Sequence, residues 1–271
     1  MNHKSRNRRS IIFYSALEPA RWEDGVASGA DIFCLDLEDS TSDDRKAEAR
    51  DVCLPLFERS VDRPVLRTVR INSPHSDEGV RDMLAISQLK SPPDGVVIPK
   101  VTSAEEVRWV AGILAPHHPD LELIVLIEDQ KGLENARTIA KAVPQISTLF
   151  LGYADFSGEI GSDFAMDSLR HMRSRIVMAA SEAGIDAMDG PFFEPTDIEG
   201  LVAETKIVAG MGFTGILLVR TAWATVNSGS QLTDALVAHM SHKTKEGFGR
   251  QRLWGSVAWG SMSLVAGQLI R

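Results

Sequence analysis

The chain has 271 residues, 44% of them hydrophobic and 24% charged, which is an ordinary globular composition with enough apolar material to bury a large core. Its formal net charge of −8 argues against nucleic acid or an anionic membrane surface as a partner, because both repel a negatively charged protein. The only cysteines are Cys34 and Cys53, without a CxxC or cysteine–histidine spacing, so we expect a reduced, cytoplasmic protein without disulfides or a cysteine-bound metal.

The first ten residues, MNHKSRNRRS, are basic and precede an apolar run at 11–16. That run is too short, and too soon followed by charged residues, for a signal peptide or a membrane span. Arg6, Arg8 and Arg9 predict either a solvated tail over residues 1–10 or a phosphate-binding patch. We expect the tail, because chain termini are commonly disordered.

Apolar runs of strand length then alternate eight times with stretches of helical spacing. The strands are predicted at 11–16, 31–40, 63–74, 93–100, 122–127, 148–154, 185–197 and 213–227. Eight βα units in a chain of this length indicate an α/β protein, a single-domain (β/α)8 TIM barrel over residues 11–228. A doubly wound sheet is disfavoured, because no GxGxxG motif follows a strand into a helix.

A helical extension is predicted after the barrel, over residues 229–271. Its apolar positions include Trp254, Trp259, Leu264 and Val265, a pattern more typical of a contact between subunits than of a lid over a ligand. We therefore expect a homo-oligomer, a trimer or a hexamer.

Two predicted strands deliver a carboxylate at their C-terminal ends. Glu128 follows LIVLI and Asp155 follows LFLGYA, and both are expected to be exposed at the mouth of the barrel. Carboxylate oxygens suit Mg²⁺, which commonly takes one or two protein carboxylates and completes its shell with water and substrate oxygens. The alternative is that both acids only cap the helices that follow them.

Further charged residues follow the second and third strands. Asp36, Glu38 and Asp39 end the second strand, where the period of two directs Asp36 and Glu38 to one face. Arg70 stands at the exit of the third strand, and its guanidinium can fork a carboxylate or phosphate. The alternative for Arg70 is a salt bridge to an acid of a neighbouring strand, and the two roles can coexist.

The fourth and seventh strands add candidates for substrate binding. Lys100 ends the fourth strand, where we expect it to supply positive charge; a Schiff-base lysine is the less usual alternative. Gly190 and Pro191 follow the seventh strand, and a glycine there can let the backbone approach a ligand closely.

Several segments together carry a family resemblance. ADIFCLDLEDSTSDDRKAEAR, VRIN, GVVIPKV, LIEDQKGLENARTIA, LFLGYADFSGEIG and AGIDAMDGPFFEPTDIEGL occur in this order within residues 9–215. They resemble the signatures of the HpcH/HpaI aldolase and citrate lyase β-subunit superfamily, nearest to its citrate lyase β-like branch. The resemblance implies a TIM barrel, Mg²⁺ at Glu128 and Asp155, and Arg70 on the carboxylate of a 2-oxo or hydroxy acid. It also implies a lyase or aldolase that breaks or forms carbon–carbon bonds, commonly on CoA thioesters of the malyl, citramalyl or citryl type.

In that chemistry a base must take the hydroxyl proton, and Glu38 or Asp39, acting through a water, is the candidate by position. Asp36 and Glu38 can instead hold metal-bound waters. The sequence departs from the branch after the eighth strand, where TGILLVRTAWATVN lacks the usual lysine and Ile-His-Pro-x-Gln segment. It also has no acidic residue after Glu246. Two alternatives to a CoA-thioester lyase therefore stay open: a CoA-independent aldolase on a free 4-hydroxy-2-oxo acid, and a non-catalytic metabolite-binding protein.

Overall fold

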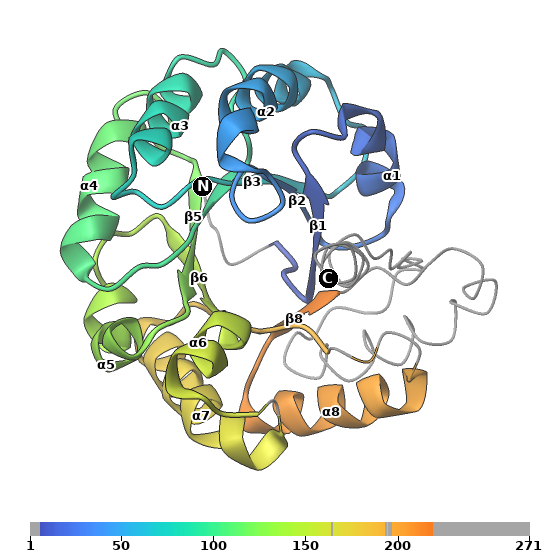
Figure 1. Cartoon of the computed structure of the whole chain (residues 1–271), viewed down its shortest axis with the longest axis vertical. Helices are drawn as coiled ribbons and strands as arrows, with labels where there is room; N and C mark the ends of the chain where they lie inside the picture. The colour runs from blue at the N-terminus through green and yellow to red at the C-terminus, as the bar shows by residue number, and fades with distance from the viewer. Residues whose placement is uncertain (1–5, 164, 193, 195–196, 219–271) are drawn as a thin grey trace.

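Eight parallel strands close into a barrel in the order β1 to β8, and the eight α-helices of the described residues surround it (Figure 1). The computed structural model describes the chain except for residues 1–5, 164, 193, 195–196 and 219–271. The strands are β1 Ser10–Ser15, β2 Ile32–Asp36, β3 Leu66–Arg70, β4 Gly95–Ile98, β5 Glu122–Ile127, β6 Ile146–Leu151, β7 Asp186–Asp189 and β8 Gly215–Leu218. The helices are α1 Trp22–Ala27, α2 Lys46–Cys53, α3 Asp77–Ser87, α4 Ala104–Leu114, α5 Gln130–Ile139, α6 Tyr153–Ile160, α7 Met166–Ala183 and α8 Ile198–Met211. The predicted (β/α)8 class is confirmed.

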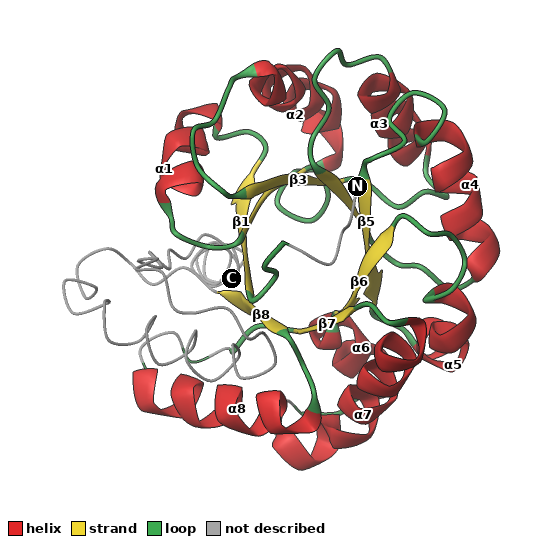
Figure 2. Ribbon diagram, turned by 180° about the vertical axis from the view of Figure 1, so that it is seen from behind, coloured by secondary structure: helices red, strands yellow, loops and turns green. Residues whose placement is uncertain are grey.

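Most strands are largely apolar because both faces of the sheet are covered, as is usual for parallel sheets, although β3 (LRTVR) and β7 (DAMD) carry polar residues. One face packs under the ring of helices, which Figure 2 shows from the opposite side. The other face fills the barrel with a separate buried cluster that includes Ile32, Cys34, Ile124, Phe150 and Met188. Since Ile32 and Cys34 point inward, the period of two also directs Asp36, the last residue of β2, into the C-terminal end of the barrel.

The predicted second and sixth strands are longer than the observed ones. Asp36 ends β2 because its carboxylate accepts the backbone N–H groups of Glu38 and Ser40, both at 3.0 Å, which turns the chain out of the sheet. At β6 the strand stops at Leu151, and Tyr153 already belongs to α6. Both ends lie at the mouth of the barrel.

The N-terminal end of the barrel corrects the predicted tail. Arg8 is only 4% exposed, with Nη2 2.8 Å from Glu122 Oε2 and Nη1 3.1 Å from Asp186 Oδ2. Arg9 pairs with Asp31 at 2.7 Å, and Ser10 already belongs to β1. The expectation of a solvated segment is therefore wrong for residues 8–10, because acids at the starts of the strands bind these arginines.

The predicted extension at 229–271 and the end of the predicted eighth strand lie outside the described residues, so the apolar positions assigned to a subunit contact stay a prediction. Among the helices that the structure describes, none combines the length and apolarity needed to cross a membrane.

Candidate active site

The C-terminal end of the barrel joins Asp36 to Arg70 in a two-point ion pair. The two residues are register partners at the ends of β2 and β3. Arg70 donates from Nε to Asp36 Oδ1 and from Nη2 to Asp36 Oδ2, both at 2.7 Å. Asp36 is fully buried and Arg70 is 8% exposed, so the pair is shielded from water. The salt bridge considered for Arg70 is thus present.

The remaining nitrogen of Arg70 faces two more acids. Its Nη1 lies 3.1 Å from Glu38 Oε2 and 3.1 Å from Asp39 Oδ2. Burial alone would raise the pKa of Asp36, but the charge and hydrogen bonds of Arg70 hold it below its ordinary value. Nη1 is thus the nitrogen of Arg70 that faces acids other than Asp36, and a further anion would compete there with Glu38 and Asp39.

Lys100 extends the network from the end of β4. Its Nζ lies 2.7 Å from Glu38 Oε1, and Glu38 is itself buried. Burial lowers the pKa of Lys100, but the hydrogen bond and charge of Glu38 outweigh it and the net pKa is raised. This keeps Lys100 cationic and disfavours the Schiff-base alternative. Burial also raises the pKa of Glu38, with Arg70 opposing.

Lys100 has a second role through its backbone. Its φ of 54° lies in the left-handed region, and it is the non-glycine residue with positive φ in the described part of the chain. This conformation turns the Lys100 N–H to Glu128 Oε1 at 2.7 Å. Strained backbone of this kind persists where the surroundings enforce it, often at functional sites.

Glu128 follows β5 and is buried, 6% exposed, which corrects the expectation of an exposed acid. Gly152, at the end of β6, covers it: a Cβ at position 152 would stand 2.7 Å from Glu128 Cβ and 2.8 Å from Oε2. Sequence reasoning missed Gly152, although a glycine between an apolar strand and an acid was a visible signal. Burial raises the pKa of Glu128 to about 8, and the charges of Glu38 and Asp155 add to the effect while Arg70 opposes it.

Asp155 lies in the first turn of α6 and is exposed. Its charge acts on Glu128, so the structure brings the two predicted metal ligands to the same end of the barrel, on consecutive βα units. Glu128 is not the cap of α5, because that role belongs to Asp129, whose Oδ1 accepts the Gly132 N–H at 2.6 Å. The capping alternative is therefore wrong for Glu128.

The charge balance of this cluster suits a divalent cation. Arg70 and Lys100 pair with three carboxylates, those of Asp36, Glu38 and Asp39. Two more acids lie at this end, Glu128, which accepts the Lys100 N–H, and Asp155, whose charge acts on Glu128. No group of three or more histidine, cysteine or acidic side chains with metal-binding geometry occurs among the described residues. Mg²⁺ does not require one, since it is often held by one or two carboxylates. Buried Glu128, whose ionised form is poorly compensated by the protein, fits such a ligand.

Gly190 and Pro191, predicted to bind substrate, are placed differently from the other candidates. The space beside Gly190 is filled by a protein ring, because a Cβ there would stand 2.4 Å from Tyr153 Cε1. Pro191 is half-buried. The structure does not join either residue to Arg70, and their roles in binding stay a prediction.

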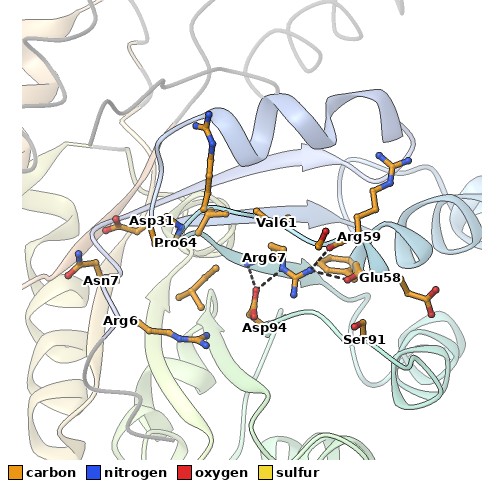
Figure 3. A pocket seen from close by; sticks show the side chains of 15 residues that line it. Arg6, Asn7, Asp31, Glu58, Arg59, Val61, Pro64, Arg67, Ser91 and Asp94 are labelled. Carbon is orange, nitrogen blue, oxygen red and sulfur yellow. Dashed lines mark hydrogen bonds and ion pairs between the residues drawn. The ribbon is translucent and has the colours of Figure 1, made fainter. Parts of the chain in front are cut away.

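A cavity of about 650 Å³ lies at the opposite end of the barrel, beside the N-terminal ends of β2, β3 and β4 (Figure 3). Arg67 stands in it with Nε 2.9 Å from Asp94, and Arg59 extends away from that pair. Functional groups of TIM barrels lie at the C-terminal ends of the strands, and the charges of this cavity are largely paired. The Arg70 cluster is therefore the better candidate for chemistry.

A TIM barrel with a buried arginine and several carboxylates at its mouth has the groups to bind a small acid or a cation. The sequence model of the HpcH/HpaI aldolase/citrate lyase family matches residues 9–221, and the chain belongs to this family. The resemblance seen in the sequence is confirmed.

Three proteins similar to this chain have named activities or bound ligands. A (3S)-malyl-CoA thioesterase of Cereibacter sphaeroides is 31% identical over 225 residues, which cover 82% of this chain and 76% of the relative. The mitochondrial citramalyl-CoA lyase of Homo sapiens is 29% identical over 231 residues, 79% of this chain and 68% of the relative. A citrate lyase β subunit of Mycobacterium tuberculosis, solved with oxaloacetate and magnesium, superposes with a TM-score of 0.67 at 29% identity and covers 80% of this chain and 93% of its own. Membership of this family supports an enzyme with lyase activity.

Proposed function

We propose that this protein is a Mg²⁺-dependent carbon–carbon lyase that acts on a hydroxy acid carried as a CoA thioester, of the malyl or citramalyl type. The observation that carries the proposal is the meeting of Arg70, Lys100, Glu128 and Asp155 at one end of the barrel. The magnesium and oxaloacetate of the M. tuberculosis structure and the CoA-linked names of the relatives support it.

Each residue has a role in this proposal. Glu128 and Asp155 would hold Mg²⁺, which would supply Lewis-acid polarisation of the substrate oxygens. Arg70 Nη1 and Lys100 Nζ bind and orient the substrate carboxylate. Asp36 fixes the Arg70 guanidinium through both of its oxygens and thereby sets the direction of Nη1.

Proton transfer falls to Glu38 or Asp39. Burial raises the pKa of Glu38 above that of an ordinary glutamate, which makes it a better proton acceptor near neutral pH. The base takes the hydroxyl proton, the carbon–carbon bond breaks, and its electron pair moves into the thioester as an enolate. Protonation of the enolate carbon balances the proton removed, so the products are an oxoacid and an acyl-CoA.

Thioester hydrolysis is a second candidate, favoured by the name of the C. sphaeroides relative. The same site would bind malyl-CoA, but water would attack the thioester and the products would be malate and free CoA. The residues after 218, where the sequence departs from the citrate lyase β-like branch, lie outside the described part of the chain. The CoA-independent aldolase and the metabolite-binding protein therefore also remain alternatives.

One set of incubations separates these functions. The full chain is mixed with Mg²⁺ and malyl-CoA, or with acetyl-CoA and glyoxylate or pyruvate, and products are identified by chromatography and mass spectrometry. We expect acetyl-CoA and glyoxylate from malyl-CoA, and no turnover by Glu128→Gln. Glu105→Gln, an exposed acid on α4, serves as the matched control and should behave as wild type.

Other products would redirect the proposal. Free CoA and malate without glyoxylate would indicate the thioesterase. Turnover of free 4-hydroxy-2-oxo acids but of no thioester would indicate the CoA-independent aldolase. Binding of an oxoacid with Mg²⁺ but no product from any of these substrates would indicate a metabolite-binding protein.

A further inference from the structure

A second buried charge cluster lies outside the barrel, under α6, α7 and α8. Arg173 of α7 is fully buried, and its Nη2 lies 2.8 Å from Oδ2 of Asp189, the equally buried last residue of β7. Arg173 Nε donates to Asp189 Oδ1 at 3.2 Å, and Nη2 also contacts Glu204 of α8. The guanidinium of Arg173 is thus buried among described residues, and the proposed reaction does not use it.

The guanidinium of Arg173 also reaches α6. Its Cζ lies 5.3 Å from the ring centroid of Tyr153, the first residue of that helix. The edge of the same ring lies against Gly190, where even a Cβ would come within 2.4 Å of Cε1. Tyr153 is only 2% exposed. A flat guanidinium suits this stacking, whereas a lysine ammonium does not.

The first turn of α6 depends on such contacts. The helix has eight residues, and its N-cap, Gly152, has no side chain to bond the free N–H groups. Short helices gain most of their stability from tertiary packing. Among the contacts of this turn, Gly152 packs on Glu128 and Tyr153 packs on Arg173, while Phe156 is buried in the core under the helices. Asp155 lies two residues further on, in the same turn.

Stability alone is a poor explanation for this cluster. Replacing a buried ion pair by apolar groups of similar volume is often neutral or stabilising. Burial raises the pKa of Asp189 to about 6 even beside Arg173, so ionised Asp189 is not fully compensated. The cluster does, however, fix the orientation of a planar group against Tyr153.

We propose that Arg173, held by Asp189 and Glu204, is a positioning residue that acts through Tyr153 to fix the first turn of α6 and the carboxylate of Asp155. We name these four residues, Arg173, Asp189, Glu204 and Tyr153, the Arg173 clamp. The proposal deepens the function proposed above and rests on it, because Asp155 matters there as a metal ligand.

The test compares two paired variants of the full chain. Arg173→Met/Asp189→Asn removes the two fully buried charges of the clamp together and leaves Glu204, whose side chain is 21% exposed, without its partner. Arg8→Met/Glu122→Gln removes a comparable buried pair at the other end of the barrel. Three quantities are measured: the melting temperature, the Kd for Mn²⁺ by electron paramagnetic resonance, and hydrogen–deuterium exchange of residues 152–160 without metal. Should the clamp variant not fold, Tyr153→Leu removes the stacked ring without touching a charge.

We expect the clamp variant to bind Mn²⁺ at least ten-fold more weakly than the wild type and to exchange the amides of α6 faster. Arg173→Lys, which keeps the charge, should show smaller changes in both the affinity and the exchange rate. The control pair should change the melting temperature but neither of the other two readouts. Wild-type affinity and exchange in the clamp variant, or equal losses in both paired variants, would overturn the positioning role. A wild-type protein that binds no Mn²⁺ would instead overturn the metal site, while the exchange measurement still decides whether the clamp holds α6.

Discussion

Gly152→Ala is the sharpest available perturbation of the site, because it adds one methyl group beside Glu128. The new Cβ would stand 2.7 Å from Glu128 Cβ, whereas ordinary contacts begin at 3.4 Å, so the two must separate by the difference of roughly 0.7 Å. The Cβ of Glu128 is close to the backbone and moves less easily than the end of the side chain. We therefore expect the carboxylate to leave the position set by the Lys100 N–H.

Displacing a metal ligand by this amount should weaken Mn²⁺ binding about 10- to 100-fold, or about 1.4–2.8 kcal/mol, by analogy with the loss of groups that orient metal ligands. Overpacking should also lower the free energy of unfolding by about 1–3 kcal/mol. Calorimetric titration with Mn²⁺ and thermal unfolding of the metal-free protein measure the two effects separately.

Gly158→Ala is the matched control on the same helix. A Cβ at position 158 meets nothing within 4 Å, so this alanine should leave Mn²⁺ binding unchanged. It should stabilise α6 by up to about 1 kcal/mol through its higher helix propensity. Gly152→Ala with wild-type affinity for Mn²⁺ would refute the placement of Glu128 in the metal site.

Three further predictions address individual side chains. Glu128→Gln and Asp155→Asn should each abolish Mn²⁺ binding while the circular dichroism spectrum stays native; retained affinity in both would contradict the site. Arg70→Lys keeps the charge but loses the two-point bond to Asp36, so the free energy of oxoacid binding should weaken by about 2 kcal/mol. Titration with pyruvate measures this binding, and an unchanged Kd would contradict the role of Arg70. Burial raises the pKa of Asp189 in the folded protein to about 6 from an ordinary 3.8, with Arg173 opposing. The protonated side chain therefore stabilises the folded protein fully below pH 3.8, and this stabilisation is lost as the pH rises through 6. Asp189→Asn should flatten this fall in denaturant titrations between pH 4 and 7, and an unchanged slope would contradict the assignment.

The strand positions could be predicted from the sequence because buried parallel strands leave continuous apolar runs. The period of two put Asp36 and Glu38 on one face of the second strand, and the salt bridge considered between Arg70 and an acid of a neighbouring strand is the one observed with Asp36. What these rules cannot give is the direction and burial of a side chain beyond the end of a strand. Glu128 was expected to be exposed for that reason.

The contacts that sequence reasoning missed join residues far apart in the chain. Arg8 bonds Glu122, which is 114 residues away in the sequence. A basic run at a chain terminus does not itself indicate whether the folded protein places acids beside it. Arg173 showed only as a charge within a helix with an apolar stripe, although it is fully buried. Gly152 needs no unusual φ, so its requirement arises from the closeness of Glu128, which follows a different strand.

The two ends of the barrel differ in how their charges are balanced, and this difference locates function better than cavity size does. At the N-terminal end Arg8, Arg9 and Arg67 each bind an acid, within 3 Å, at the start of a strand. At the C-terminal end the carboxylates outnumber the cations, and Glu128 is buried there with a pKa raised to about 8, chiefly by burial. Balanced pairs close the barrel at little cost, whereas an uncompensated buried acid lowers stability unless a ligand supplies the missing charge. The surplus of acids at the mouth, where TIM barrels bind their ligands, therefore supports the proposal that a cation binds there and that the cation and Arg70 together hold the substrate acid.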